Sequence, residues 1–149
     1  MGGIVMVEFN FKSQIATTKE QSERLLALGL KKETADMVHY RSSSIQNWGI
    51  FAKPWRGDYE GSQWYYPAWS LGRLLEMLPS PIPISETLPT FNHYAFLNLS
   101  AESVVYCWED YDGAGRALVG FTGNGFFAAV VDATEWLIKE ENFNKEYLI

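Results

Sequence analysis

Aromatic residues constrain the fold of this chain more than any other feature of its sequence. Six Trp, eight Tyr and nine Phe make up 15% of its 149 residues. Rings of this size bury large apolar areas and dominate the interiors of domains. A chain of this length also buries roughly 70% of the surface that its unfolded form exposes. We therefore expect a single domain over residues 1–149, built around a large aromatic core.

Cysteine content and hydropathy indicate the compartment. The single cysteine, Cys107, cannot form an internal disulfide, whereas chains built for oxidising compartments usually carry an even number. The longest apolar runs are far shorter than the ~20 residues of a membrane span. The apolar stretch Met1–Val7 lacks the basic residues and cleavage site of a signal peptide, so we interpret it as a strand or an ordered tail. These features predict a soluble, cytoplasmic protein that does not enter a membrane.

Charge is unevenly distributed along the chain, whose net charge is −6. Residues 1–57 hold 8 Lys or Arg and 5 Asp or Glu, whereas residues 58–149 hold 4 and 13. Phosphate binding requires clustered Lys and Arg, so we expect no direct contact with nucleic acid. The acidic part supports an alternative hypothesis, in which the protein mimics the phosphates of DNA and inhibits a nucleic-acid-binding protein.

Capping signals and apolar periodicity predict three helices. The first begins at overlapping capping boxes, one of which pairs Thr18 with Gln21. The second takes Ser70 as its N-cap. Each has an apolar side that must pack on another element. Their expected bounds are about 18–28, 71–78 and 126–141.

Alternating apolar and polar residues predict an antiparallel sheet of about four to five strands. The strands Phe91–Leu99, Val104–Trp108 and Ala117–Thr122 follow one another through short turns and should form a C-terminal meander. A further short strand is expected within Gln46–Ala52. Together with three helices packed on one face, these strands define an α+β fold.

Four aromatic residues in a glycine-bounded segment are the candidate binding residues: Trp55, Tyr59, Trp64 and Tyr65. Flat rings offer a partner large contact area at low entropy cost. The alternative interpretation places these rings in the core, and solvent exposure distinguishes the two. Our leading hypothesis is a non-catalytic module that binds a protein partner, and the sequence leaves self-association open.

An enzyme would have to use Cys107 with His93, which lie on neighbouring expected strands. A hydrolase or transferase of this kind needs a thiolate beside an imidazole. However, a lone cysteine between Tyr106 and Trp108 is typical of a buried, inert residue. The glycines of residues 120–125 match neither nucleotide-binding fingerprint. The sequence therefore favours a protein that is not an enzyme, and it predicts no cofactor.

Asp110 and Asp112 are the candidate metal ligands. A calcium loop that began at Asp110 would place Ala114 and Phe121 where oxygen ligands are required. A hairpin turn is the better interpretation, with Gly113 in the left-handed conformation and the acidic side chains in water. We therefore expect no metal.

Helix-capping and packing motifs recur in three segments, residues 20–37, 67–79 and 133–138. The second begins Pro67-Ala68-Trp69-Ser70-Leu71, and the third reads Ala133-Thr134-Glu135-Trp136-Leu137-Ile138. These segments resemble a family of small uncharacterised proteins carried by prophages and conjugative elements of gut-dwelling anaerobic bacteria. The resemblance implies a shared fold and an accessory role in a mobile genetic element. It implies no activity, cofactor or binding residue.

Overall fold

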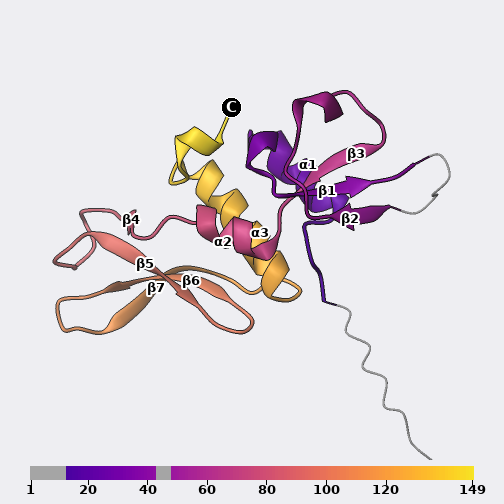
Figure 1. Ribbon diagram of the computed structural model, residues 1–149. Coiled ribbons are helices and arrows are strands. Elements are labelled where there is room, and N and C mark those ends of the chain that lie inside the picture. Colours follow the sequence, from indigo (N-terminus) through magenta and orange to yellow (C-terminus); the bar gives the residue numbers. More distant parts are fainter. Residues whose placement is uncertain (1–12, 43–47) are drawn as a thin grey trace, which may run out of the picture.

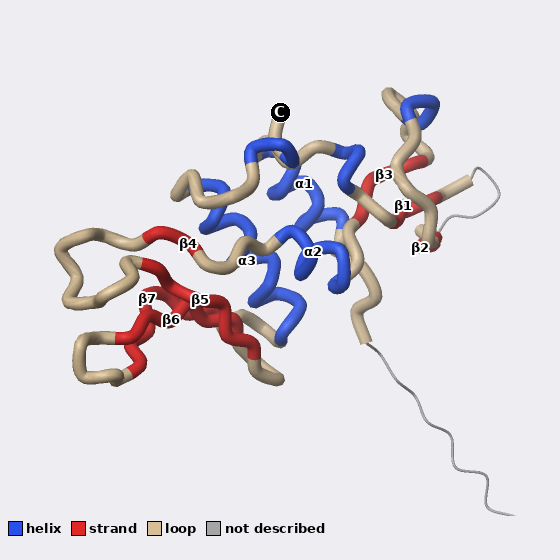
Figure 2. The backbone as a smooth tube through the Cα atoms, turned by 60° about the vertical axis from the view of Figure 1, so that its left-hand side comes forward, coloured by secondary structure: helices blue, strands red, loops and turns tan. Residues whose placement is uncertain are grey.

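The computed structural model describes residues 13–42 and 48–149. Its three α-helices lie between two antiparallel sheets, which confirms the predicted α+β class. The two sheets occupy opposite ends of the molecule, as Figures 1 and 2 show. The strand or tail expected at Met1–Val7 lies outside the described residues.

The C-terminal sheet contains the predicted meander. Its strand order is β4-β5-β6-β7, and all pairs are antiparallel. Along β6, Val104 and Tyr106 are fully buried, whereas Cys107 points to the other face beside Phe96. One face therefore belongs to the core. The strands are β4 (Ile82–Pro83), β5 (Tyr94–Leu99), β6 (Val104–Glu109) and β7 (Gly115–Phe121).

The helix α3 (Phe126–Lys139) packs on β6 and β7 of this sheet, and α2 (Leu71–Met77) packs against α3. The helix α2 begins at the predicted N-cap, where the Ser70 hydroxyl accepts a hydrogen bond from the backbone amide of Arg73. Between helix and sheet, the buried Tyr106 hydroxyl donates a 2.7 Å hydrogen bond to a backbone carbonyl, and burial raises its pKa. Seven residues of α3 are buried, so this helix forms the centre of the core.

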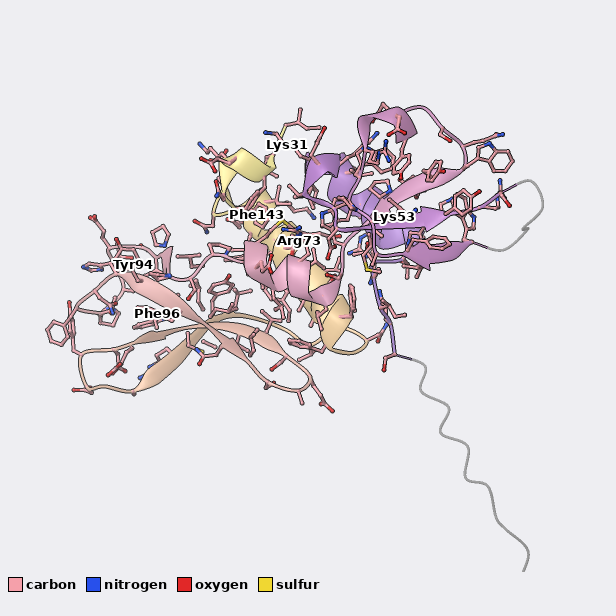
Figure 3. The ribbon with its side chains drawn as sticks, viewed as in Figure 1. Lys31, Lys53, Arg73, Tyr94, Phe96 and Phe143 are labelled. Atoms are coloured by element: carbon pink, nitrogen blue, oxygen red, sulfur yellow. The ribbon has the colours of Figure 1, made fainter. Side chains whose placement is uncertain are left out.

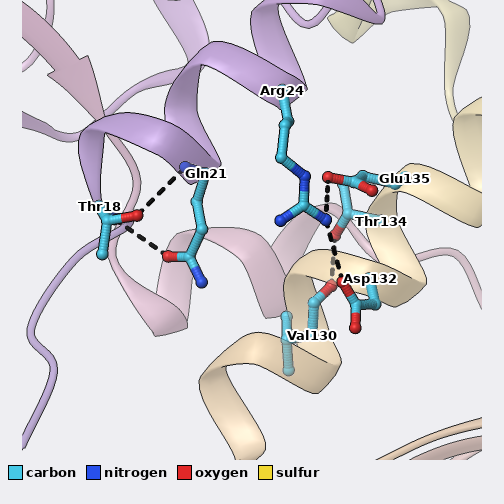
Figure 4. Close-up of polar contacts among 7 residues, drawn as sticks. All are labelled: Thr18, Gln21, Arg24, Val130, Asp132, Thr134 and Glu135. Atoms are coloured by element: carbon cyan, nitrogen blue, oxygen red, sulfur yellow. Dashed lines mark hydrogen bonds and ion pairs between the residues drawn. The ribbon is translucent and has the colours of Figure 1, made fainter. Parts of the chain in front are cut away.

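The helix α1 (Lys19–Ala27) starts with the predicted capping box. The backbone amide of Gln21 donates to the Thr18 hydroxyl, and the Gln21 side chain accepts from the Thr18 backbone amide (Figure 4). One turn further along the helix, Arg24 forms ion pairs with Asp132 and Glu135 of α3 at 3.2 and 2.7 Å. Because Arg24 is half exposed, these pairs orient α1 on α3 more than they stabilise it.

A second, N-terminal sheet has the order β2-β1-β3. Its strands are β1 (Met37–Tyr40), β2 (Gly49–Phe51) and β3 (Tyr65–Ala68). The sequence predicted β2 but neither β1 nor β3. Three consecutive residues of β1 are buried, so the alternation that marks a half-exposed strand is missing there. The strands thus divide between two sheets, where the sequence suggested one.

The inner face of the N-terminal sheet packs on α1 and the segment before it. Met37 of β1 and Ala68 of β3 form a small buried cluster with Ala16. His39 is also buried there, with its Nε2 2.7 Å from the backbone carbonyl of Thr17. Since one face is occupied in this way, the side chains that alternate with these residues lie on the outer face.

Candidate functional site

The outer face of the N-terminal sheet carries large aromatic rings. Register places Val38 opposite Phe51, and Tyr40 opposite Tyr65. Successive residues of a strand point to opposite faces, so these four side chains share the face that α1 does not cover. Phe51 is 43% exposed, and Tyr40 and Tyr65 are half-buried.

The loop between β2 and β3 adds two more rings to this face. A short 3₁₀ helix, Gly57–Tyr59, turns the chain so that Tyr59 stacks on Tyr65, with ring centroids 4.0 Å apart and planes 12° from parallel. Trp55 meets Tyr59 edge to face at 5.5 Å. Tyr40 meets Tyr65 at 5.1 Å and Phe51 at 5.7 Å, so the five rings form one continuous chain.

Two hollows adjoin the stacked pair. The first has a volume of about 290 Å³ and is lined by Val38, Tyr40, Phe51, Lys53, Tyr59 and Tyr65. The second, of about 370 Å³, is lined by residues that include Trp55, Tyr59, Tyr65, Tyr66 and Pro67. Tyr65 and Tyr66 belong to opposite faces of β3, so the second hollow lies along the outer edge of this strand. We call the two hollows together the aromatic groove.

Positive charge borders the aromatic groove. Lys53 lines the first hollow, and no described carboxylate forms an ion pair with it. Arg56 lies 5.8 Å from the Tyr59 ring and pairs with Asp58 at 3.1 Å. Lys32, beside the second hollow, is neutralised by Glu60 at 2.6 Å. Lys53 is therefore the uncompensated charge of the first hollow.

Three of the four predicted binding residues come together in this groove. Tyr59 is 8% exposed and largely a structural element, whereas Trp55 and Tyr65 are half-buried with surfaces that line the hollows. Trp64 lies elsewhere, because it alternates with Tyr65 and its ring instead contacts Arg41 at 5.7 Å. The set is neither wholly core nor wholly exposed.

The sequence interpretation missed three residues that complete the groove, Tyr40, Phe51 and Lys53. They come from β1, from β2 and from the turn after β2. The strand β1 pairs with β3 across at least 25 positions of sequence, and β2 joins the sheet through β1. Their only sequence signal is the two-residue spacing of Phe51 and Lys53, which places both on one face of an extended segment.

Cys107 and His93 do not form a catalytic pair. Cys107 lies on the outer face of the C-terminal sheet, opposite Phe96 and Ala117, and lines a hollow that His93 does not border. His93 adopts a positive φ of 56° before β5, and no hydrogen bond joins it to Cys107. The thiol therefore lacks the neighbouring base that activation requires.

Asp110 organises the β6–β7 turn through hydrogen bonds. Its carboxylate accepts from the backbone amides of Asp112 and Ala114 and from Arg116 Nε at 3.0 Å. The amide of Ala114, followed by the side chain of Arg116, lowers the pKa of Asp110. The sequence interpretation was wrong to place this acid in water, because it is 8% exposed. In residues 13–42 and 48–149, no cluster of three or more His, Cys, Asp or Glu side chains is arranged to hold a metal.

A second group of exposed rings lies at the opposite end of the molecule. On the outer face of the C-terminal sheet, Tyr94 is 45% and Phe96 46% exposed. Figure 3 shows these two side chains far from Lys53. They contact no other ring within the described residues, in contrast to the interlocked rings of the aromatic groove. We therefore regard the aromatic groove as the candidate site.

Comparisons of the chain with protein-family models, with curated proteins and with solved structures found no match. No helix of the described residues combines the length and the apolar character that a membrane crossing requires.

Proposed function

We propose that this protein is a non-catalytic binding module that takes a segment of a protein partner into its aromatic groove. The observation that carries the proposal is the pair of hollows beside the stacked rings of Tyr59 and Tyr65. Aromatic side chains are enriched at the centres of protein interfaces, where a few buried rings supply most of the binding free energy.

The ring contacts also support binding without rearrangement. Each ring of the groove touches at least one other, and these contacts restrict its rotamers before a partner arrives. Preorganised side chains lose little conformational entropy on binding. The groove therefore has the rigidity expected of a recognition surface.

We prefer this function to the two alternatives from the sequence. The hydrolase or transferase hypothesis needs Cys107 beside a base, and His93 lies outside its hollow. The DNA-mimic hypothesis needs free carboxylates along one face. Six of the acidic residues after Gly57 instead form ion pairs with Lys or Arg: Asp58, Glu60, Glu76, Asp110, Asp132 and Glu135.

The resemblance in three helix-capping segments suggests where this binding module acts. We propose that it belongs to the family of small proteins carried by prophages and conjugative elements, and that it serves as an accessory protein in the cytoplasm of the bacterial host. The single cysteine agrees with a reducing compartment. A protein partner encoded by the host or by the element would then occupy the groove.

A peptide selection tests the proposed function. A random peptide library displayed on phage is selected against the whole protein, and the recovered peptides are synthesised and titrated by calorimetry. We expect Phe51→Ala to weaken their binding roughly tenfold or more, because Phe51 lines the first hollow.

The matched control is Phe96→Ala. Phe96 has nearly the same exposure as Phe51, 46% against 43%, but lies on the C-terminal sheet. This variant should bind the peptides as the wild type does. A library that yields no ligand sensitive to Phe51→Ala, or ligands equally sensitive to both variants, would refute the proposed function.

A further inference from the structure

We propose that the partner segment is a proline-containing, acidic peptide in the extended polyproline II conformation. This inference rests on the proposed function and names the chemistry of its ligand. Three features of the first hollow carry it: the hydrogen-bonding character of its lining, its position on the sheet and its uncompensated positive charge.

The polar side chains that line the first hollow can all donate hydrogen bonds to a ligand rich in acceptors, although the phenol hydroxyls can also accept them. Their polar groups are the hydroxyls of Tyr40, Tyr59 and Tyr65 and the ammonium group of Lys53. Among the described residues, none of the three hydroxyls hydrogen-bonds to another residue. Those of the half-buried Tyr40 and Tyr65 are the better placed to donate to a ligand, because Tyr59 is only 8% exposed. A segment with prolines presents carbonyl oxygens but lacks some backbone N–H groups, and it therefore needs donors more than acceptors.

The position of the groove disfavours addition of a β-strand. The edge strand β2 has only three residues, and the other edge strand, β3, has four and contains Pro67, which has no backbone N–H to donate. An added strand would therefore find few backbone groups to pair with. A polyproline II segment needs no backbone ladder, because its carbonyl groups point outward to side-chain donors.

Two hollows beside one stacked pair of rings call for two apolar groups in the ligand. A polyproline II helix has three residues per turn and rises about 3.1 Å per residue, so residues i and i+3 lie on one side about 9 Å apart. The stacked rings of Tyr59 and Tyr65 border both hollows. Prolines at i and i+3 would place one ring in each hollow and straddle the stacked pair.

The positive charge of Lys53 is the reason for proposing an acidic side chain in the ligand. Lys53 lines the first hollow without a carboxylate partner among the described residues. Arg56 adds positive charge beside the Tyr59 ring. A Glu or Asp of the ligand next to the first proline would pair with Lys53 at the border of the first hollow.

Synthetic peptides test the inference on the full chain. The probe is a capped peptide of about ten residues with prolines at i and i+3 and two glutamates beside one of them. Two matched peptides replace both prolines by alanine or both glutamates by glutamine. We expect each replacement to weaken binding roughly five- to tenfold, as measured by calorimetry.

A protein variant tests the charge. Lys53→Gln should remove most of the difference between the glutamate and glutamine peptides and reduce the dependence of binding on salt. The control is Lys145→Gln, which neutralises an exposed lysine near the C-terminal end of the chain. This control should keep the full preference for glutamate.

The outcomes separate this inference from the proposed function. If the phage library yields ligands sensitive to Phe51→Ala but the acidic proline peptide binds no better than its alanine form, the ligand assignment is wrong and the proposed function stands. Binding of a neutral oligosaccharide in the groove, or a dimer that Phe51→Ala dissociates in sedimentation, would also overturn the assignment. If no peptide binds the groove, both proposals fail.

Discussion

The ring of Tyr59 stacks on that of Tyr65, with centroids 4.0 Å apart and planes 12° from parallel. Tyr59 belongs to the loop between β2 and β3, whereas Tyr65 opens β3. The contact therefore fixes the loop on the sheet and at the same time forms the boundary of both hollows. Stability and binding should depend on the same pair of rings.

Tyr59→Ala should destabilise the protein by roughly 3 kcal/mol, because the loss of a buried ring leaves a cavity. Urea denaturation followed by Trp fluorescence measures the change. Tyr111→Ala is the control, since Tyr111 also contacts another ring, that of Phe91 at 4.5 Å, but is 55% exposed. The control should cost about 1 kcal/mol or less. Equal losses would mean that the loop is not held by Tyr59.

Asp110→Asn should reduce the amount of unfolding free energy that the protein loses as the pH falls. The pKa of Asp110 is lowered in the folded protein, chiefly by the amide of Ala114 and the side chain of Arg116. An ionised carboxylate with a lowered pKa stabilises the fold above its unfolded pKa, and this stabilisation is lost as pH falls through its folded pKa. Urea denaturation at about pH 7 and about pH 3 measures the difference.

The control for this pH dependence is Asp112→Asn in the same turn. Asp112 is exposed, and its carboxylate accepts no hydrogen bond from a described residue. The wild type and Asp112→Asn should therefore lose the same stability between the two pH values, and Asp110→Asn should lose less. An unchanged pH dependence in Asp110→Asn would show that its hydrogen bonds do not favour the ionised form.

Thr18→Ala should cost about 1 kcal/mol, because it removes the hydroxyl that accepts from the amide of Gln21 at the start of α1. Chemical denaturation measures the loss. Thr122→Ala, at an exposed position between β7 and α3, should change stability by about 0.5 kcal/mol or less. A loss at Thr18 as small as that at Thr122 would mean that α1 is held by tertiary packing alone.

Local signals made much of the fold predictable. The capping box of Thr18 and Gln21 and the N-cap Ser70 mark helix starts that depend on neighbouring residues only. The C-terminal meander was visible because alternation is clear where one face is buried and short turns join the strands. The strand β1 was missed because Met37, Val38 and His39 are all buried and do not alternate.

The candidate site was only partly predictable for a related reason. Ring density identified Trp55, Tyr59 and Tyr65, but it also included Trp64, which strand alternation places apart from them. Tyr40 and Phe51 reach the groove through pairing between segments distant in sequence. Such pairing depends on the register of the whole sheet, and no local pattern reveals it.

The position of a bound peptide tests the proposed function most directly. A peptide from the library is added to isotope-labelled protein, and the shifts of its backbone amide resonances are followed by NMR. We expect the affected amides to cluster in β1, in β2 and the two residues after it, and in residues 55–67, with β5, β6 and β7 unaffected. Shifts concentrated on β5, β6 and β7, around Tyr94 and Phe96, would place the binding surface on the other sheet and contradict the assignment of the aromatic groove.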